Sequence, residues 1–213
     1  MYNFKELKEN LIDSFKIVNT ISLELFELNG GLPLERIKRT FDKFSITYND
    51  EILNFYSQLN GVHIEWEFDY DQNFNKKRFK KDRSSVKGSI VIPTLDEFLE
   101  EESQTYLSFW EAKLVDYAKD DLMNLRCIDY GWPYWLVGVP SVGNKIITDQ
   151  IFYLYQDDED FSSCECSITN YWSKCLEFRG IEFWEEILIY GDGYSSKEKE
   201  IKHHLNEIFS ITS

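Results

Sequence analysis

The chain has 213 residues, of which 43% are hydrophobic and 16% aromatic, and its formal net charge is −15 at pH 7. This length and apolar content can bury a substantial core, so we expect one domain over residues 1–213 rather than two, and no disordered chain. The excess of acids argues against nucleic acid or an anionic membrane as partner, because a negative surface repels both and attracts basic surfaces. Acidity that serves only solubility is the simpler alternative.

The N-terminal part is predicted to be helical. Its first residues carry acids and no continuous apolar core, and no later run approaches 18 apolar residues, so we expect a cytoplasmic protein without membrane contact. Apolar residues recur at helical spacing from Phe4 to Leu28, and Gly30 and Gly31 act as a stop. A second helix is expected over Leu34 to Phe44, with Pro33 in its first turn.

Residues 46–69 show the clearest local pattern, which predicts a helix, a tight stop and a strand. Ile52, Tyr56 and Leu59 form an apolar helical stripe behind a cap at Asn49 or Asp50. Gly61 lies where a helix commonly ends with positive φ. From Val62 to Phe68 apolar and polar residues alternate, which is typical of a half-buried strand. Its polar face carries His63, Glu65 and Glu67.

Residues 70–85 are polar and without period, and we expect a loop that joins two strands of a hairpin. Six of the 23 basic residues lie in residues 76–83 with Asp82 as their only acid, so the remaining 17 basic and 37 acidic residues give the rest of the chain a net charge of −20. Against that body, a solvated loop tip is a better interpretation of the cluster than a contact with RNA or an acidic partner.

The middle of the chain alternates strands with helices. A strand is expected from Val86 to Ile92, closed by Pro93, and Thr94 or Asp96 can cap a helix that runs through Glu102. The acids of this helix, Glu100, Glu101 and Glu102 among them, have an ordinary explanation in the helix dipole. A further amphipathic helix is predicted over Thr105 to Lys119.

The C-terminal half begins with an aromatic-rich stretch from Asp129 to Pro133, which we expect to form a turn that covers the sheet, with a binding surface as the alternative. The unbroken apolar run from Tyr134 to Val139 predicts a central strand, ended by Pro140, and a turn at Gly143-Asn144 leads towards a further strand from Ile151 to Tyr155. Four consecutive acids then predict an exposed loop of strong negative potential, because they cannot all be buried unpaired. These acids are Asp157, Asp158, Glu159 and Asp160.

The end of the chain is predicted to be mostly helical. A helix capped by Ser167 or Thr169 reaches Phe178, and the apolar stretch from Ile181 to Tyr190 is of undetermined type. A break at residues 191–193 precedes a closing amphipathic helix from Ser195 to Phe209.

Three short motifs carry a family resemblance: the helix–strand entry ILNFYSQLNG at residues 52–61, GSIVIPTLDEFL from Gly88 to Leu99, and the closing helix SITNYWSKCLEF from Ser167 to Phe178. They resemble motifs of the SUKH superfamily, which includes many bacterial toxin-immunity proteins and a fungal regulator of cell-wall synthesis. The resemblance covers residues 32–178. A helical insert between Phe98 and Leu125 and an extension after Phe178 depart from the family.

Residues that suit catalysis or metal binding are few. The four cysteines and three histidines lack zinc-site spacing, and reduced structural thiols are the simpler interpretation. A cysteine–histidine pair that meets only in space, and paired acids such as Glu65 and Glu67 acting as general acid and base, remain alternatives. We therefore predict no catalytic residue, no metal site and no cofactor.

These observations predict an α+β fold: a mostly antiparallel central sheet of about five or six strands, with N-terminal, middle and C-terminal helices packed on it. The resemblance implies a non-enzymatic immunity protein that occupies a toxin of nuclease or deaminase type, and the chain's charge suits a partner with a basic cleft. A regulatory or scaffold protein with a basic client is the alternative, followed by a small hydrolase. The expected contact residues are Asp157, Asp158, Glu159 and Asp160, then Glu65, Glu67, Glu100, Glu101 and Glu102.

Overall fold

The structure is a computed structural model that describes residues 4–17, 21–69, 85–100, 125–131, 135–155, 162–191 and 195–209. The loops predicted at residues 76–83 and 157–160 and the helix predicted at 105–119 lie outside these residues. Helices and antiparallel sheets make up the described part, which confirms the α+β class.

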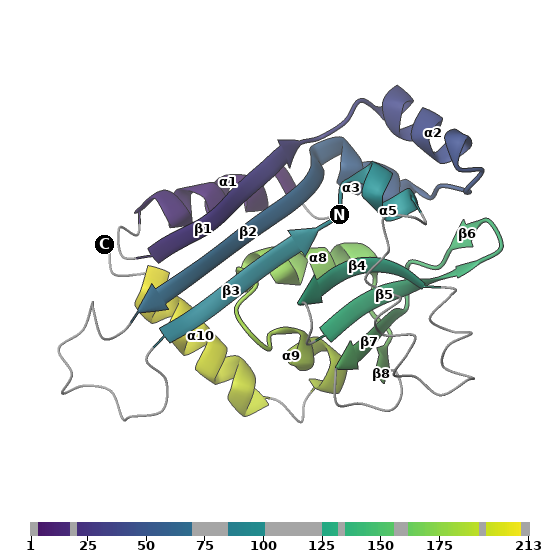
Figure 1. The fold of residues 1–213 in the computed structure, drawn as a ribbon. Coiled ribbons are helices and arrows are strands. Elements are labelled where there is room, and N and C mark those ends of the chain that lie inside the picture. Colours follow the sequence, from purple (N-terminus) through teal and green to yellow (C-terminus); the bar gives the residue numbers. More distant parts are fainter. Residues whose placement is uncertain are drawn as a thin grey trace, which may run out of the picture.

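The strands form two antiparallel sheets instead of the single sheet that we expected (Figure 1). The first has the order β1-β2-β3, and the second has the order β4-β5-β7-β8 with β6 paired to β5. The described residues therefore contain eight strands, above the five or six of the predicted single sheet. Their bounds are β1 Ile21–Gly30, β2 Leu59–Asp69, β3 Ser85–Ile92, β4 Leu125–Gly131, β5 Trp135–Val142, β6 Lys145–Ile146, β7 Ile151–Tyr155 and β8 Ser162–Cys164.

Helices cover one face of the three-stranded sheet and leave the other to the pocket described below. Figure 1 shows α1, α8 and α10 behind this sheet, and the rings of Phe15 on α1 and Phe209 on α10 both pack against Trp66 of β2. No helix in the described part is long and apolar enough to cross a membrane. The helices are α1 Phe4–Ile17, α2 Leu34–Lys43, α3 Asp50–Gln58, α5 Leu95–Leu99, α8 Ile168–Glu177, α9 Glu185–Tyr190 and α10 Ser195–Phe209.

The prediction of one helix from Phe4 to Leu28 is wrong in its second half. The helix α1 ends at Ile17, and Ile21–Gly30 is the edge strand β1, which pairs antiparallel with β2. The run ISLELFEL fits a strand as well as a helix, since apolar and polar residues alternate in its first half. Pairing with β2 decides between them, a tertiary effect that overrides local spacing.

The predicted helix cap and strand alternation within residues 46–69 are confirmed. The side chain of Asn49 accepts a hydrogen bond from the Ile52 N–H at 2.9 Å, and the α3 helix ends at Gln58. Gly61 has the expected positive φ of 95°, but it lies inside β2 rather than at the helix end. Residues 62, 64, 66 and 68 of β2 are buried, whereas 63, 65 and 67 are not, as the period of two predicts.

Several predicted boundaries move by a few residues. The α5 helix, capped by Thr94 as expected, stops at Leu99 rather than Glu102, and β5 continues through Pro140 to Val142. Asp129 to Gly131 belong to strand β4 instead of a turn, and α9 begins only at Glu185. The position of β5 between β4 and β7 confirms the prediction of a central strand.

The two sheets meet beside β3 without joining into one. The chain after α8 runs along the outer edge of β3, where Gly180 C=O accepts from Ser89 N–H at 2.8 Å and Lys87 C=O accepts from Glu182 N–H at 3.1 Å. Further along β3, the side chain of Asp129 on β4 accepts a hydrogen bond from the backbone of Val91. The sheets therefore diverge around the segment at residues 180–185.

Candidate functional site

A pocket of about 640 Å³ lies where the two sheets diverge. Its lining comes from β1, β2 and β3 on one side, from β4, β5 and β7 on another, and from residues 180–185. Five glutamates line it, against one lysine and one histidine, and we call it the acidic pocket. The glutamates are Glu24, Glu65, Glu67, Glu182 and Glu185.

Strand geometry places three of these glutamates on one face. Glu65 and Glu67 point away from the helix-covered side of β2 because residues two apart in a strand share a face. Glu24 lies at an irregularity in the β1–β2 register, between the pairs Leu23–Trp66 and Leu25–Glu65. Such a bulge turns a side chain out of the regular alternation. The sheet therefore supplies three carboxylates to one wall of the pocket.

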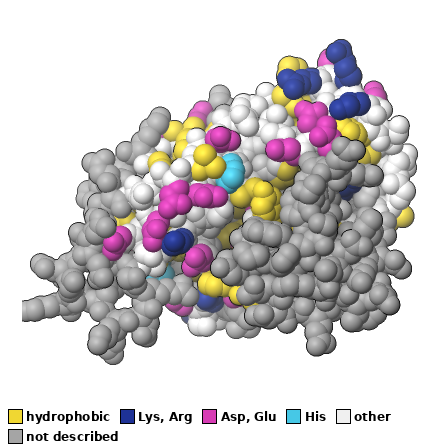
Figure 2. Space-filling view, viewed as in Figure 1, with side chains coloured by type: hydrophobic (Ala, Val, Ile, Leu, Met, Phe, Trp, Pro, Cys, Tyr) yellow, Lys and Arg dark blue, Asp and Glu magenta, His cyan; other side chains and the backbone are white. Residues whose placement is uncertain are grey.

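The charges in the pocket are only partly compensated. Lys87 Nζ lies 3.5 Å from Glu67, and His63 Nε2 lies 3.0 Å from Glu65, an ion pair only when the imidazole is protonated. Among the described residues, no cation lies within ion-pair distance of Glu24 or Glu182, and both are exposed. Figure 2 shows acidic side chains gathered over the three-stranded sheet. This surface attracts positive charge.

Aromatic rings form the opposite wall. Tyr130, Trp135 and Tyr155 come from three neighbouring strands of the second sheet, and Trp135 and Tyr155 are direct partners in the β5–β7 register. Phe183 adds a ring from the segment beside β3, and Lys197 Nζ lies 4.9 Å from its centroid. Aromatic faces attract cations through their quadrupole. Carboxylates and aromatic rings together suit an organic cation.

A second depression of about 190 Å³ continues the acidic pocket along the sheet. The two share His63, Val91 and Tyr130, and the second adds Glu27 and Glu97. The acidic surface thus extends from residues 180–185 across β2 to the start of α5.

A buried polar cluster lies behind the pocket. Asp129 accepts hydrogen bonds from Tyr130 N–H and from Tyr171 Oη, each at 2.9 Å, and Cys175 Sγ lies 3.9 Å from it. Burial raises the pKa of Asp129 to about 8, although these hydrogen bonds act in the opposite direction. Burial, with Asp129 nearby, also raises the pKa of Glu185 well above its usual 4.5. In both side chains burial thus shifts the equilibrium towards the protonated form.

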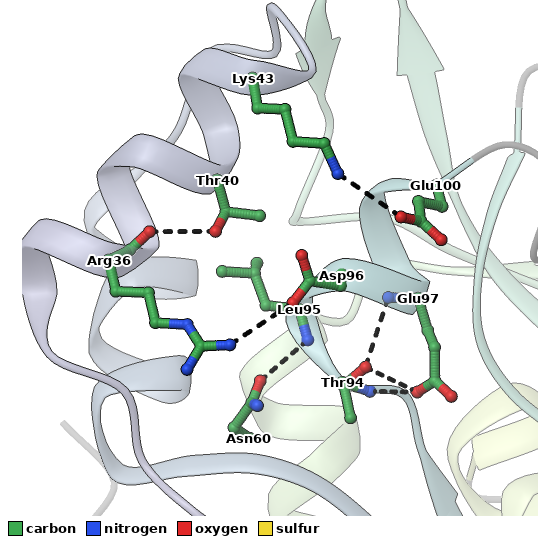
Figure 3. Close-up of polar contacts among 9 residues, drawn as sticks. All are labelled: Arg36, Thr40, Lys43, Asn60, Thr94, Leu95, Asp96, Glu97 and Glu100. Atoms are coloured by element: carbon green, nitrogen blue, oxygen red, sulfur yellow. Dashed lines mark hydrogen bonds and ion pairs between the residues drawn. The ribbon is translucent and has the colours of Figure 1, made fainter.

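The structure separates the predicted contact residues. Glu65 and Glu67 line the acidic pocket, whereas Glu100 is the C-cap of α5 and lies 3.6 Å from Lys43 of α2. Figure 3 shows the polar contacts between α2 and α5. Arg36 lies 4.0 Å from Asp96, and the Thr94–Glu97 capping box begins α5. Glu100 thus has a structural partner away from the pocket. Glu101, Glu102 and Asp157 to Asp160 lie outside the described residues.

Three pocket glutamates are not predicted from the sequence. Glu24 lies in the stretch for which the spacing predicts a helix, and Glu182 and Glu185 follow the motif at residues 167–178 in a stretch of undetermined type. The alternation around Glu24 in ISLEL is a local signal that could have marked it as a strand residue. No local signal marks Glu182 or Glu185, because their place depends on a segment that returns to β3 from the far end of the chain.

The pocket is concave, as the hydrolase alternative requires, and it contains an imidazole and carboxylates. No cysteine lines it; all four cysteines are free, and Cys127, Cys166 and Cys175 are buried. Ser89 lies opposite Glu65 in the β2–β3 register, but no hydrogen bond links its hydroxyl to His63 in the described structure. Nor do the described residues group three or more metal-ligating side chains. The pocket thus offers acceptors and rings for binding.

No protein-family model, curated protein or solved structure matches the chain. The SUKH resemblance and the function that it implies stay predictions. The chemistry of the acidic pocket is the structural basis for a functional proposal.

Proposed function

We propose that this protein is a non-enzymatic binding protein of the SUKH type, an immunity protein that neutralises a bacterial toxin by covering its basic cleft. The acidic pocket is the observation that carries the proposal, because it presents five glutamates beside a single lysine. Toxins of the nuclease or deaminase type act on nucleic acid, and proteins that bind phosphate backbones carry clusters of lysine and arginine. An acidic surface complements such a cluster.

The charge of the whole chain supports rapid association with a basic partner. At a net charge of −15, the protein attracts a cationic surface over a distance of about 8–10 Å at physiological ionic strength. Electrostatic complementarity raises association rates far more than it raises affinity, and salt weakens the effect. A protein that must intercept a toxin soon after it appears benefits from this property.

Glu65 and Glu67 are the contact residues with the best structural support. They lie on strand β2, on the face that described helices leave open, and they belong to the pocket. Asp157 to Asp160 and Glu100 to Glu102 stay in the proposal as further contacts. Of these, Glu100 already pairs with Lys43, so it ranks below the strand residues.

The test uses the purified products of the genes adjacent to the one that encodes this chain. We expect one of them to bind, and the double variant Glu65→Lys/Glu67→Lys to associate at least about tenfold more slowly at low salt with a flatter salt dependence. The control is Glu9→Lys/Asp13→Lys, which makes the same change of charge on exposed positions of α1. Stopped-flow experiments at several salt concentrations measure the association rate and its salt dependence for both variants.

The control should slow association much less, because α1 covers the opposite face of the sheet. Equal slowing by both variants would show that net charge alone matters and that the pocket does not contact the toxin. Binding of no adjacent gene product would contradict the immunity function. In that case a regulatory or scaffold protein with a basic client becomes the better proposal.

A further inference from the structure

Glu185 is an unusual member of the acidic pocket because it is buried. It begins α9, is 2% exposed and lines the pocket, yet its Oε2 has no hydrogen-bond partner among the residues that the structure describes. Its carboxylate receives a hydrogen bond from its own backbone N–H, which leaves the second oxygen unused. The other four glutamates of the pocket are at least partly accessible to solvent.

An unpartnered buried carboxyl oxygen destabilises a protein, since it loses its hydrogen bonds to water without replacement. Other acids increase this cost. Asp129 on β4 and the neighbouring Glu182 and Glu186 all disfavour the charged form of Glu185. A cation in the pocket would reverse both effects, because it supplies a donor to the free oxygen and a charge that offsets the acids.

The aromatic wall indicates which kind of cation fits. Trp135 and Tyr155 present adjacent rings from paired strands, with Tyr130 beside them. A guanidinium is planar, stacks on aromatic faces, is weakly hydrated and carries five donors that can reach several carboxylates at once. An ammonium group is compact and strongly hydrated, and it lacks the planar surface. The pocket chemistry therefore favours arginine over lysine.

We propose that the acidic pocket is a subsite for an arginine side chain of the protein partner, in which Glu185 turns its unpartnered oxygen onto the guanidinium and the aromatic wall stacks on it. Glu65 and Glu182 add carboxylates to the same group or to its neighbour. The volume of about 640 Å³ accommodates the arginine together with adjacent residues of the partner. The identity of the ligand as part of a protein rests on the proposed function.

The direct test titrates the full chain with N-acetyl-arginine N-methylamide and follows binding by NMR. The same compound with citrulline in place of arginine keeps the planar shape of the side-chain end group and removes its charge. The lysine compound keeps the positive charge but replaces the planar guanidinium with a compact ammonium group. We expect millimolar binding of the arginine compound, at least about tenfold weaker binding of the citrulline compound, and intermediate binding of the lysine compound.

Variants assign the binding to Glu185. Glu185→Gln should weaken binding of the arginine compound at least about tenfold. Glu207→Gln is the matched control. Among the described residues Glu207 also has a buried oxygen without a hydrogen-bond partner, but it lies on α10 outside the pocket. The affinity of this variant for the arginine compound should be unchanged. Should Glu185→Gln fail to fold, Glu182→Gln changes an exposed residue of the same pocket and should weaken binding about threefold.

Equal binding of the arginine and citrulline compounds, or unchanged affinity in the pocket variants, would overturn the subsite. The outcome of the arginine titration can be distinguished from the outcome of the toxin-binding experiment. Arginine binding without a bound gene product would support the subsite and contradict the immunity function. A gene product that binds and is sensitive to Glu65→Lys/Glu67→Lys, without binding of the arginine compound, would support the function and overturn the subsite.

Discussion

Asp129 ties three parts of the molecule together through one side chain. It lies on β4 beside an irregularity of the β4–β5 register, and it accepts hydrogen bonds from Val91 of β3, from Tyr130 and from Tyr171 of α8. Because β3 and β4 belong to different sheets, this carboxyl group substitutes for the strand pairing that is absent there. Its chemistry should therefore influence the stability of the whole fold.

The raised pKa of Asp129 predicts a stability that falls with rising pH. Its folded value of about 8 exceeds its ordinary value of 3.8, so the folded protein keeps a proton that the unfolded chain releases between about pH 4 and pH 8. The stabilisation that protonated Asp129 contributes to the free energy of unfolding is complete below pH 4. It decreases by up to about 1.4 kcal/mol per pH unit between pH 4 and pH 8, and it is lost above pH 8. Glu185, whose pKa is also raised, acts in the same direction.

Asp129→Asn should remove much of this slope, whereas Asn in place of the exposed Asp149 should keep it. Urea unfolding at pH 5, 7 and 9 measures the free energy for the parent and both variants. A parent protein whose stability rises across this range would contradict the assignment of a protonated Asp129.

At the scale of the element, the packing of β2 against β3 depends on a glycine. Gly88 is the direct partner of Trp66, and a methyl group at this position would overlap the indole ring. The indole cannot easily move away, since its Nε1 donates to Arg179 C=O at 2.7 Å and its ring packs on Phe15 and Phe209. The strand that carries Glu65 and Glu67 is therefore closely packed against β3 and the helices at this point.

Gly88→Ala should therefore lower the free energy of unfolding by about 2–3 kcal/mol, the cost of overpacking a closely fitted core. The matched control is Gly30→Ala at the end of edge strand β1, where an added Cβ meets no atom within 4 Å. Its effect should be within about 0.5 kcal/mol. Chemical denaturation of the three proteins makes the comparison, and equal effects would show that the Trp66 contact does not limit the space.

At the scale of the whole molecule, acidity is the property most closely connected with the proposed function. The chain carries 38 acidic and 23 basic residues, and the described pocket collects five of the acids around one opening. Long-range attraction depends on the sum of these charges, whereas the fit to a partner depends on the few that line the pocket.

Charge reversal of Asp157, Asp158, Glu159 and Asp160 should slow association with the adjacent gene product and flatten its salt dependence, because four consecutive acids create a strong local potential. The dissociation rate should change less, since charges in a loop that the sequence predicts to be exposed act mainly on encounter. Stopped-flow association and dissociation at several salt concentrations separate the two effects. Unchanged association would remove this loop from the mechanism.

Local sequence patterns predict structure correctly where neighbouring residues form one cap, one strand face or one helix face. The cap at Asn49, the alternation from Val62 to Phe68, the cap at Ser167 and the closing amphipathic helix all appear in the structure as expected. The prediction for β1 is wrong, because the spacing of its residues suits either a helix or a strand and only pairing with β2 makes it a strand. Of the predicted contact acids, the structure brings Glu65 and Glu67 into the pocket.

By itself, the sequence determined the α+β class, most of the helices and strands, and the negative charge, since these depend on residues a few positions apart or on composition alone. Only the tertiary structure decided that the strands form two sheets, that Asp129 is buried between them, and that Glu24, Glu65 and Glu185 meet in one pocket. The physical reason is distance along the chain: that pocket requires contacts between segments more than 100 residues apart, which no local spacing encodes.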